Sequence, residues 1–207
     1  MFAGLLRCVC VKEQSMEKLL SILSQIIPVS PELKTAIINS IKRETFKRRE
    51  FLLSPDAVSN KIYFVESGLA RGFYLKETPN EAKDITTWLM KENEFIISIV
   101  SFYSRQPSYE YIEALEDITA WSISYERIQQ LYQSFPEFNA VGRVLTEKYY
   151  VQSERRSYYL RTQTAEERLR SLLSDFPTIF GRVKHHHVAS LLGIKPETLS
   201  RAMKKKI

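Results

Sequence analysis

Seven polar side chains near the C-terminus have the types and spacing that contact DNA. They are Lys195, Glu197, Thr198, Ser200, Arg201, Lys204 and Lys205. On a helix that begins at Pro196, they lie on the outer face, because Leu199 and Ala202 supply its apolar inner face. Such a pattern is typical of the second helix of a helix-turn-helix, which enters the major groove. The lysines at its end suit salt-dependent contacts with phosphates.

Two short helices joined at Gly193 must position these side chains. The glycine supplies the backbone freedom of the tight turn. Pro196 fits the first position of the second helix, where an amide hydrogen would be unpaired anyway. Ala189 is small enough to let the two helices approach, and the inner face consists of Val188, Leu192, Ile194, Leu199 and Ala202. The other interpretation is a helical hairpin that packs on the body of the protein and leaves its lysines solvated.

The distribution of charge favours a polyanion as the partner of this region. The net charge is +6, and all of the excess positive charge lies after residue 142. Lys195 stands where Ser, Thr, Asp or Asn would usually cap the free amides of the second helix. A DNA phosphate could meet those amides instead.

Composition is that of an ordinary globular protein of 207 residues, with 44% hydrophobic and 26% charged residues. No apolar run approaches the roughly 20 residues of a membrane span, and the first residues make a poor secretory signal. We therefore expect a cytoplasmic protein with no membrane partner. Cys8 and Cys10 alone cannot hold an iron–sulfur cluster or a zinc ion, and we expect the fold to begin near Ser15.

Helical periodicity opens the chain and then gives way to strands. Ser15–Ile27 and Pro31–Ile41 each place aliphatic side chains on one stripe of a helix. Strands are expected at residues 43–53, 61–76 (two strands with a hairpin turn at Ser67-Gly68), 85–90, 94–100, 109–115 and 118–123, with a loop at residues 78–80. Short strands at regular spacing indicate a β-sandwich, roll or barrel of about 100 residues.

A long helix is predicted after the strands, from Pro136 to Leu160. Its inward positions recur every three or four residues, at Phe138, Val141, Leu145 and Tyr149. A helix of roughly 22 residues extends about 33 Å, and a roll cannot cover its whole apolar stripe. A second copy of the chain could cover the rest, as in a coiled coil.

A further helix begins at Thr164, which has the spacing of a capping box with Glu167. The predicted fold class is therefore α+β in three parts. Residues 15–135 form an antiparallel, jelly-roll-like β-roll with flanking helices, which is the effector domain. Residues 136–161 form the dimerisation helix, and residues 162–207 form the helix-turn-helix domain.

This order of elements resembles the Crp–Fnr family of bacterial transcription regulators, in a short form without a β-wing. The most specific segments are Ile62–Tyr74, Asn93–Ile99 and Leu191–Arg201. The resemblance implies a cyclic-nucleotide-binding-like domain and a homodimer on promoter DNA, with RNA polymerase and an unidentified small-molecule effector as further partners. It also places Glu197 and Arg201 where family members read bases. Arg can bond guanine through two hydrogen bonds, and Glu can accept one from cytosine.

The resemblance places an effector pocket at Ile97, Ser98, Ser108 and Tyr109. Family members that bind cyclic nucleotides hold the ribose with a Gly-Glu pair and the phosphate with an Arg about ten residues later. Ile97-Ser98 replaces that pair, and Arg105 lies two or three residues out of register with the Arg. Because burying a phosphate without a cation is unfavourable, we expect no tight binding of cyclic AMP.

Other groups of side chains admit both a structural and a chemical explanation. Three adjacent imidazoles at residues 185–187 point in different directions on a helix and cannot share one metal ion well, so we expect them to be solvated or to face phosphate. Four aromatic residues could stack on a ligand or pack in the core: Trp88, Tyr103, Tyr109 and Tyr111. No Ser-His-acid set, carboxylate pair or Gly-rich phosphate loop is convincing, so neither catalysis nor a cofactor is expected.

The sequence as a whole favours a homodimeric, sequence-specific DNA-binding transcription regulator. The competing hypothesis is a ligand-binding or protein-interaction module whose C-terminal helices no longer read DNA. DNA binding that falls steeply with salt would separate the two.

Overall fold

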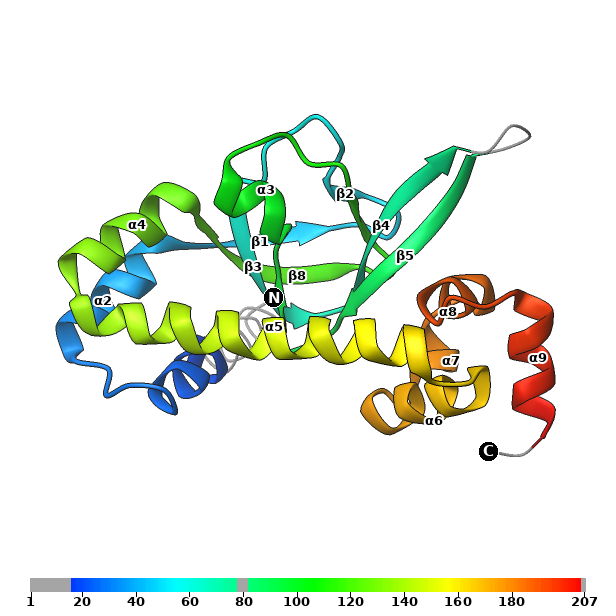
Figure 1. The fold of residues 1–207 in the computed structure, drawn as a ribbon. Helices are drawn as coiled ribbons and strands as arrows, with labels where there is room; N and C mark the ends of the chain where they lie inside the picture. Colours follow the sequence, from blue (N-terminus) through cyan, green and yellow to red (C-terminus); the bar gives the residue numbers. More distant parts are fainter. Residues whose placement is uncertain (1–15, 78–81, 206–207) are drawn as a thin grey trace, which may run out of the picture.

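The computed structural model describes residues 16–77 and 82–205 of the chain (Figure 1). The predictions made for Cys8, Cys10, Ser15 and the loop at residues 78–80 lie outside this part. The described residues form two small antiparallel sheets with flanking helices, then a long helix and a group of short C-terminal helices. The α+β fold predicted from the sequence is confirmed.

The strands of the described residues form a roll of two four-stranded sheets. The first sheet has the order β1 (Ile41–Phe46), β8 (Ile118–Ser124), β3 (Lys61–Ser67) and β6 (Phe95–Ile96). The second has the order β2 (Phe51–Leu53), β7 (Tyr111–Ala114), β4 (Ala70–Glu77) and β5 (Ala82–Met90). The space between the sheets is filled by buried apolar side chains, among them Val65, Ile96, Ile112 and Ile118.

The outer face of the first sheet is covered by helices. Side chains alternate along a strand, so Phe64 of β3 points away from the roll interior that Tyr63 and Val65 occupy. Phe64 packs in a second core with the helix at residues 16–24, α2 (Pro31–Ser40), α4 (Tyr125–Ser134) and α5 (Asn139–Thr162). The long helix α5 runs past the roll toward the C-terminal helices (Figure 1).

Three strand predictions were wrong in detail. The single strand expected at residues 43–53 is two strands, β1 and β2, because Arg49 takes a left-handed conformation (φ 72°) in the turn between them. The strand expected at residues 94–100 ends at Ile96, and a short helix, α3 (Ile99–Ser104), follows. The turn at Ser67-Gly68 exists, but β3 and β4 belong to different sheets and do not pair. Gly68 (φ 99°) carries the chain from one sheet to the other.

The C-terminal helices follow the sequence pattern closely. The 3-10 turn η1 (Pro136–Phe138) leads into α5, which has 24 residues. The capping box predicted at Thr164 and Glu167 is confirmed at the start of α6 (Ala165–Asp175). Three short helices follow: α7 (Ile179–Arg182), α8 (His185–Leu191) and α9 (Pro196–Lys204). Leu169, Ile179, Val188 and Leu199 form their common core.

Candidate nucleic-acid interface

Helices α8 and α9 form the predicted helix-turn-helix. Gly193 has a φ of 65°, which L side chains rarely adopt, and the amide of Ile194 donates to the carbonyl of Ala189 at 3.0 Å. Pro196 occupies the first turn of α9, as expected. The predicted inner face is buried at Val188, Leu192, Leu199 and Ala202, and Ala189 is buried where the helices approach.

The polar residues of α9 point away from this core. Lys195, Glu197, Ser200, Arg201, Lys204 and Lys205 are exposed, and Thr198 is half-buried. Arg201 lies one turn after Glu197, and its Nε donates to the carbonyl of Glu197 at 3.4 Å. The Nζ of Lys205 forms an ion pair with Glu166 of α6 at 2.6 Å. The structure therefore brings these seven residues together on one surface, with Lys205 already partnered.

Helix α9 begins without a side-chain cap. Lys195 is the N-cap residue, and its side chain makes no capping hydrogen bond. Pro196 has no N–H, and the amides of Thr198 and Leu199 donate to the carbonyl of Lys195 at 3.0 and 3.1 Å. In this first turn the amide of Glu197 is therefore the one left for an anion such as a phosphate.

Helix α8, in contrast, is docked on strand β5 of the roll (Figure 1). The dock centres on a group of four side chains, which we call the Arg71 cluster: Arg71, Asp84, Glu113 and His187. The buried guanidinium of Arg71 donates to Glu113 Oε2 and Asp84 Oδ2, both at 2.7 Å, and lies 2.7 Å from His187 Nδ1. It also lies 4.0 Å from the ring centroid of Phe73. Because Arg always donates, Nδ1 of His187 must accept, and the imidazole is neutral.

The expectation that all three histidines are solvated or face phosphate was wrong for His187. His185 and His186 are exposed, but His187 is buried against Arg71. Burial, and then the positive charge of Arg71, lower the pKa of His187 to about 4. The sequence could have indicated that His187 is buried, because its spacing places it on the same side of α8 as Ser190 and Leu191.

Further contacts between the roll and the C-terminal helices extend the dock. Ser190 Oγ accepts from the amide of Thr86 at 2.9 Å. Arg182 makes paired hydrogen bonds to Glu92 and to Glu116, and these contacts lower the pKa of Glu92. Leu69, at the turn between β3 and β4, is buried in the core of the C-terminal helices. The helix-turn-helix is therefore held by the roll through ion pairs and apolar packing together.

Sequence reasoning missed Arg71 and Arg182, the two arginines that carry the dock. Arg71 stands within an apolar strand, between Ala70 and Gly72, and a charged residue there is a signal that an acidic partner lies across the strand. Arg182 offered no such signal, because its partners Glu92 and Glu116 are distant in the sequence.

The four residues of the expected effector pocket do not line one cavity. Ser98 and Ser108 are buried, with their hydroxyl oxygens 3.4 Å apart. Ile97 points to the other side of the first sheet, where it lines an apolar cavity. Tyr109 is 63% exposed.

A buried acid stands beside the two serines. Trp88 Nε1 donates to Glu110 Oε2 at 3.1 Å, and Ser98 also bonds this carboxylate. Burial raises the pKa of Glu110. Arg105 makes its hydrogen bonds to Ser59, Asn60 and Phe102 and lies over the ring of Tyr125 at 4.1 Å. The two buried serines therefore have an acid beside them, and the guanidinium of Arg105 is bonded to other groups.

The aromatic residues considered as ligand-stacking groups are dispersed. Tyr103 is half exposed on α3, Tyr111 stacks on Phe73 at 4.9 Å, and Trp88 bonds Glu110. Among the described residues, no group of His, Cys, Asp and Glu is arranged to hold a metal ion. Within the same residues, no helix is long and apolar enough to cross a membrane.

Comparisons with known proteins agree with this geometry. Residues 43–135 match the cyclic nucleotide-binding domain family. The fold is similar to that of the c-di-GMP responsive global regulator CLP of Xanthomonas campestris, with 21% identity, a TM-score of 0.63 and coverage of 83% of this chain and 88% of that chain. It is also similar to FixK2 of Bradyrhizobium japonicum, with 15% identity, a TM-score of 0.68 and coverage of 80% and 83%. No curated protein matches the sequence.

A third similar structure is a transcriptional regulator of the crp/fnr family from Eubacterium rectale, with 17% identity, a TM-score of 0.66 and coverage of 87% of each chain. The chain as a whole has the fold of the Crp–Fnr regulators, which confirms the resemblance that the sequence indicated.

Proposed function

We propose that this protein is a homodimeric, sequence-specific DNA-binding transcription regulator of the Crp–Fnr type. The observation that carries the proposal is α9, a helix whose charged residues are exposed while its apolar residues are buried in the helix-turn-helix core. Glu197 and Arg201 would read bases, and Lys195, Thr198, Ser200, Lys204 and Lys205 would contact phosphates or neighbouring base edges.

We assign the three parts of the chain separate tasks. Residues 15–135 form the effector domain, residues 136–161 the dimerisation helix, and residues 162–207 the DNA-binding domain. Support for dimerisation comes from α5, which exposes Tyr150, Val151, Tyr158 and Leu160 along its length. Aromatic and aliphatic side chains exposed on one long helix are the kind of surface that a second helix covers.

The effector domain would not bind cyclic AMP tightly. A cyclic phosphate that entered the roll beside Ser98 and Ser108 would meet the acidic side chain of Glu110, while the guanidinium of Arg105 bonds the carbonyls of Ser59 and Phe102. Calorimetric titration with cyclic AMP should therefore show no sub-micromolar affinity. A sub-micromolar dissociation constant would contradict this part of the proposal.

Selection of bound fragments from random DNA tests the main proposal. A dimer that places α9 in two successive major grooves should select a palindrome with half-sites about one helical turn, or about 34 Å, apart. Its affinity should fall steeply as salt rises, because phosphates release counterions on binding. Failure to select any sequence, with weak binding at low salt, would instead favour a module whose C-terminal helices no longer read DNA.

A further inference from the structure

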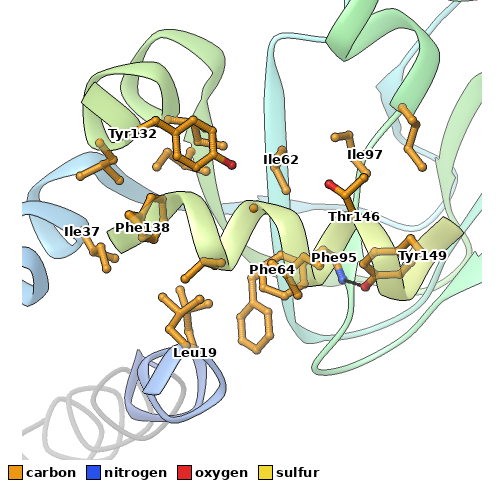
Figure 2. Close-up of a pocket in the computed structure, with 18 of the residues that line it drawn as sticks. Leu19, Ile37, Ile62, Phe64, Phe95, Ile97, Tyr132, Phe138, Thr146 and Tyr149 are labelled. Atoms are coloured by element: carbon orange, nitrogen blue, oxygen red, sulfur yellow. Dashed lines mark hydrogen bonds between the residues drawn. The ribbon is translucent and has the colours of Figure 1, made fainter. Parts of the chain in front are cut away.

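A cavity of about 280 Å³ lies on the outer side of the first sheet, under α5. Figure 2 shows Phe64 and Phe95 of the sheet, Tyr132 of α4, and Phe138, Thr146 and Tyr149 along the α5 side, all around this space. Leu19 and Leu23 of the helix at residues 16–24 close its far wall. The helix at residues 16–24, helices α2, α3, α4 and α5, and the first sheet thus line one hollow that is partly open to the surface.

The walls of the cavity are largely apolar, and the polar side-chain groups that line it are hydroxyls and the indole N–H of Trp121. Among the described residues that line it, none has a charged side chain, and none is His or Cys. Tyr149 Oη accepts from the amide of Phe95 at 2.9 Å, and the hydroxyls of Tyr103 and Thr146 are 3.5 Å apart. Burial raises the pKa of Tyr132 and of Tyr149 to about 12. Desolvation of this degree disfavours any charged occupant.

This cavity is separate from the pocket expected inside the roll. Ile96 faces the roll interior, whereas Phe95 and Ile97 on either side of it line the cavity. The first sheet therefore divides the two spaces, with Ser98, Ser108 and Glu110 on one side and the apolar walls on the other.

We propose that the cavity binds one small, uncharged, largely apolar molecule of about a dozen non-hydrogen atoms. A cavity of about 150 Å³ lined by aliphatic and aromatic residues holds benzene, so this one has room for a molecule about twice as large. A single hydroxyl or carbonyl group on the ligand would meet the hydroxyls of Thr146 or Ser153, which line the cavity from the exposed side of α5.

Occupancy would act on α5, because Val141, Leu145 and Tyr149 of this helix line the cavity. Filling the space adds contacts between α5 and the first sheet, and α5 continues toward the helix-turn-helix. An effect of the ligand on DNA binding depends on the function proposed above, whereas the binding itself does not.

The test uses the full chain with 1-decanol, an uncharged probe of eleven non-hydrogen atoms, followed by calorimetry and thermal unfolding. Saturable binding of one molecule per chain with a rise in Tm is expected. Decanoate, whose carboxylate cannot be desolvated cheaply, should bind at least tenfold more weakly. No saturable binding of decanol up to its solubility, or equal binding of decanoate, would overturn the proposal.

Variants locate the binding in this cavity. Leu145→Phe fills the cavity and should weaken decanol binding at least tenfold. Val144→Phe is the matched control, because it adds the same ring on the neighbouring residue of α5, which does not line the cavity. If Leu145→Phe fails to fold, Thr146→Trp blocks the cavity from an exposed position. Unchanged binding in the blocked variants would also overturn the proposal. Decanol binding without DNA binding would leave this inference intact and contradict the proposed function.

Discussion

Helices α8 and α9 belong to one helix-turn-helix, yet the polar face of α8 packs against the roll and the polar face of α9 is exposed. His187 and Ser190 of α8 bond Arg71 and Thr86 of the roll, and both are removed from solvent to a large extent. Glu197 and Arg201 of α9 bond no residue outside their own helix among the contacts found in the described part of the chain, and both are exposed. The polar face of α8 packs on the roll, and that of α9 is exposed to solvent.

This difference indicates how the roll can fix the orientation of α9 through α8. A rigid turn at Gly193 and a shared core join α9 to α8, so whatever fixes α8 on β5 also fixes α9. The Arg71 cluster is the most buried polar part of this dock. Changes in that cluster should therefore have larger effects on the fold than changes on α9, which should affect DNA binding alone.

The largest expected effect is that of Arg71→Met. The change removes the guanidinium that contacts Asp84, Glu113 and His187 together, and breaking a buried ion pair from one side costs about 3–5 kcal/mol. We expect a loss of that size in the free energy of unfolding, measured by urea denaturation. Hydrogen exchange should also show α8 losing protection before the strands of the roll.

Arg43→Met is the matched control for this prediction. Arg43 forms a paired contact with Glu66 within the first sheet, whereas α8 packs on β5 of the second sheet. Arg43→Met should lower the free energy of unfolding of the roll, but α8 should remain as well protected from hydrogen exchange as the strands. If both variants affected α8 alike, the Arg71 cluster would not be what holds the helix.

A smaller effect is expected from acid acting on His187. The pKa of His187 in the folded protein, about 4, lies below the ordinary value of 6.5. Between these two pH values the unfolded chain therefore binds a proton that the folded protein does not bind. The stability contribution is therefore complete above pH 6.5 and is lost as the pH falls toward 4, by at most about 1.4 kcal/mol per pH unit. Arg71, His186 and Lys184 disfavour the charged imidazole, and Asp84 favours it.

Urea denaturation between pH 7 and pH 4 measures this dependence, with His187→Gln as the comparison. Glutamine can still accept a hydrogen bond from Arg71 but does not titrate. Burial raises the pKa of Glu110, so its protonation favours the folded state in the same range, and the difference between the two proteins isolates His187. If the free energies of unfolding of the two proteins changed in parallel with pH, protonation of His187 would not destabilise the folded protein, which would contradict this prediction.

The smallest effect on the fold, and the most selective effect on function, is expected for Arg201→Ala. Loss of a base contact should weaken binding to the selected operator by about 1–3 kcal/mol, with little change on random DNA and in the free energy of unfolding. Lys204→Ala should weaken binding to both DNAs alike and reduce the salt dependence. Gel shift at several salt concentrations measures both, and an equal loss on random DNA would argue against base reading by Arg201.

Local patterns in the sequence were sufficient for the elements that local physics controls. The turn at Gly193, the position of Pro196 and the capping box at Thr164 depend on residues within a few positions of one another, and all three are confirmed. The strand boundaries near Arg49 and Ile96 were less predictable. A left-handed residue and a six-residue helix there interrupt segments whose hydrophobicity reads as continuous strand.

The sequence by itself determined the amphipathic character of α9, the presence of the long helix α5 and the order of roll, long helix and helix-turn-helix, because hydrophobic periodicity and capping are properties of neighbouring residues. Only the tertiary structure decided that His187 is buried, that Arg71 and Arg182 hold the dock, and that Ile97 and Ser98 face different spaces. Ion pairs between residues far apart in the chain, and the side of a sheet on which a cavity opens, arise when the elements pack, and no local pattern specifies them.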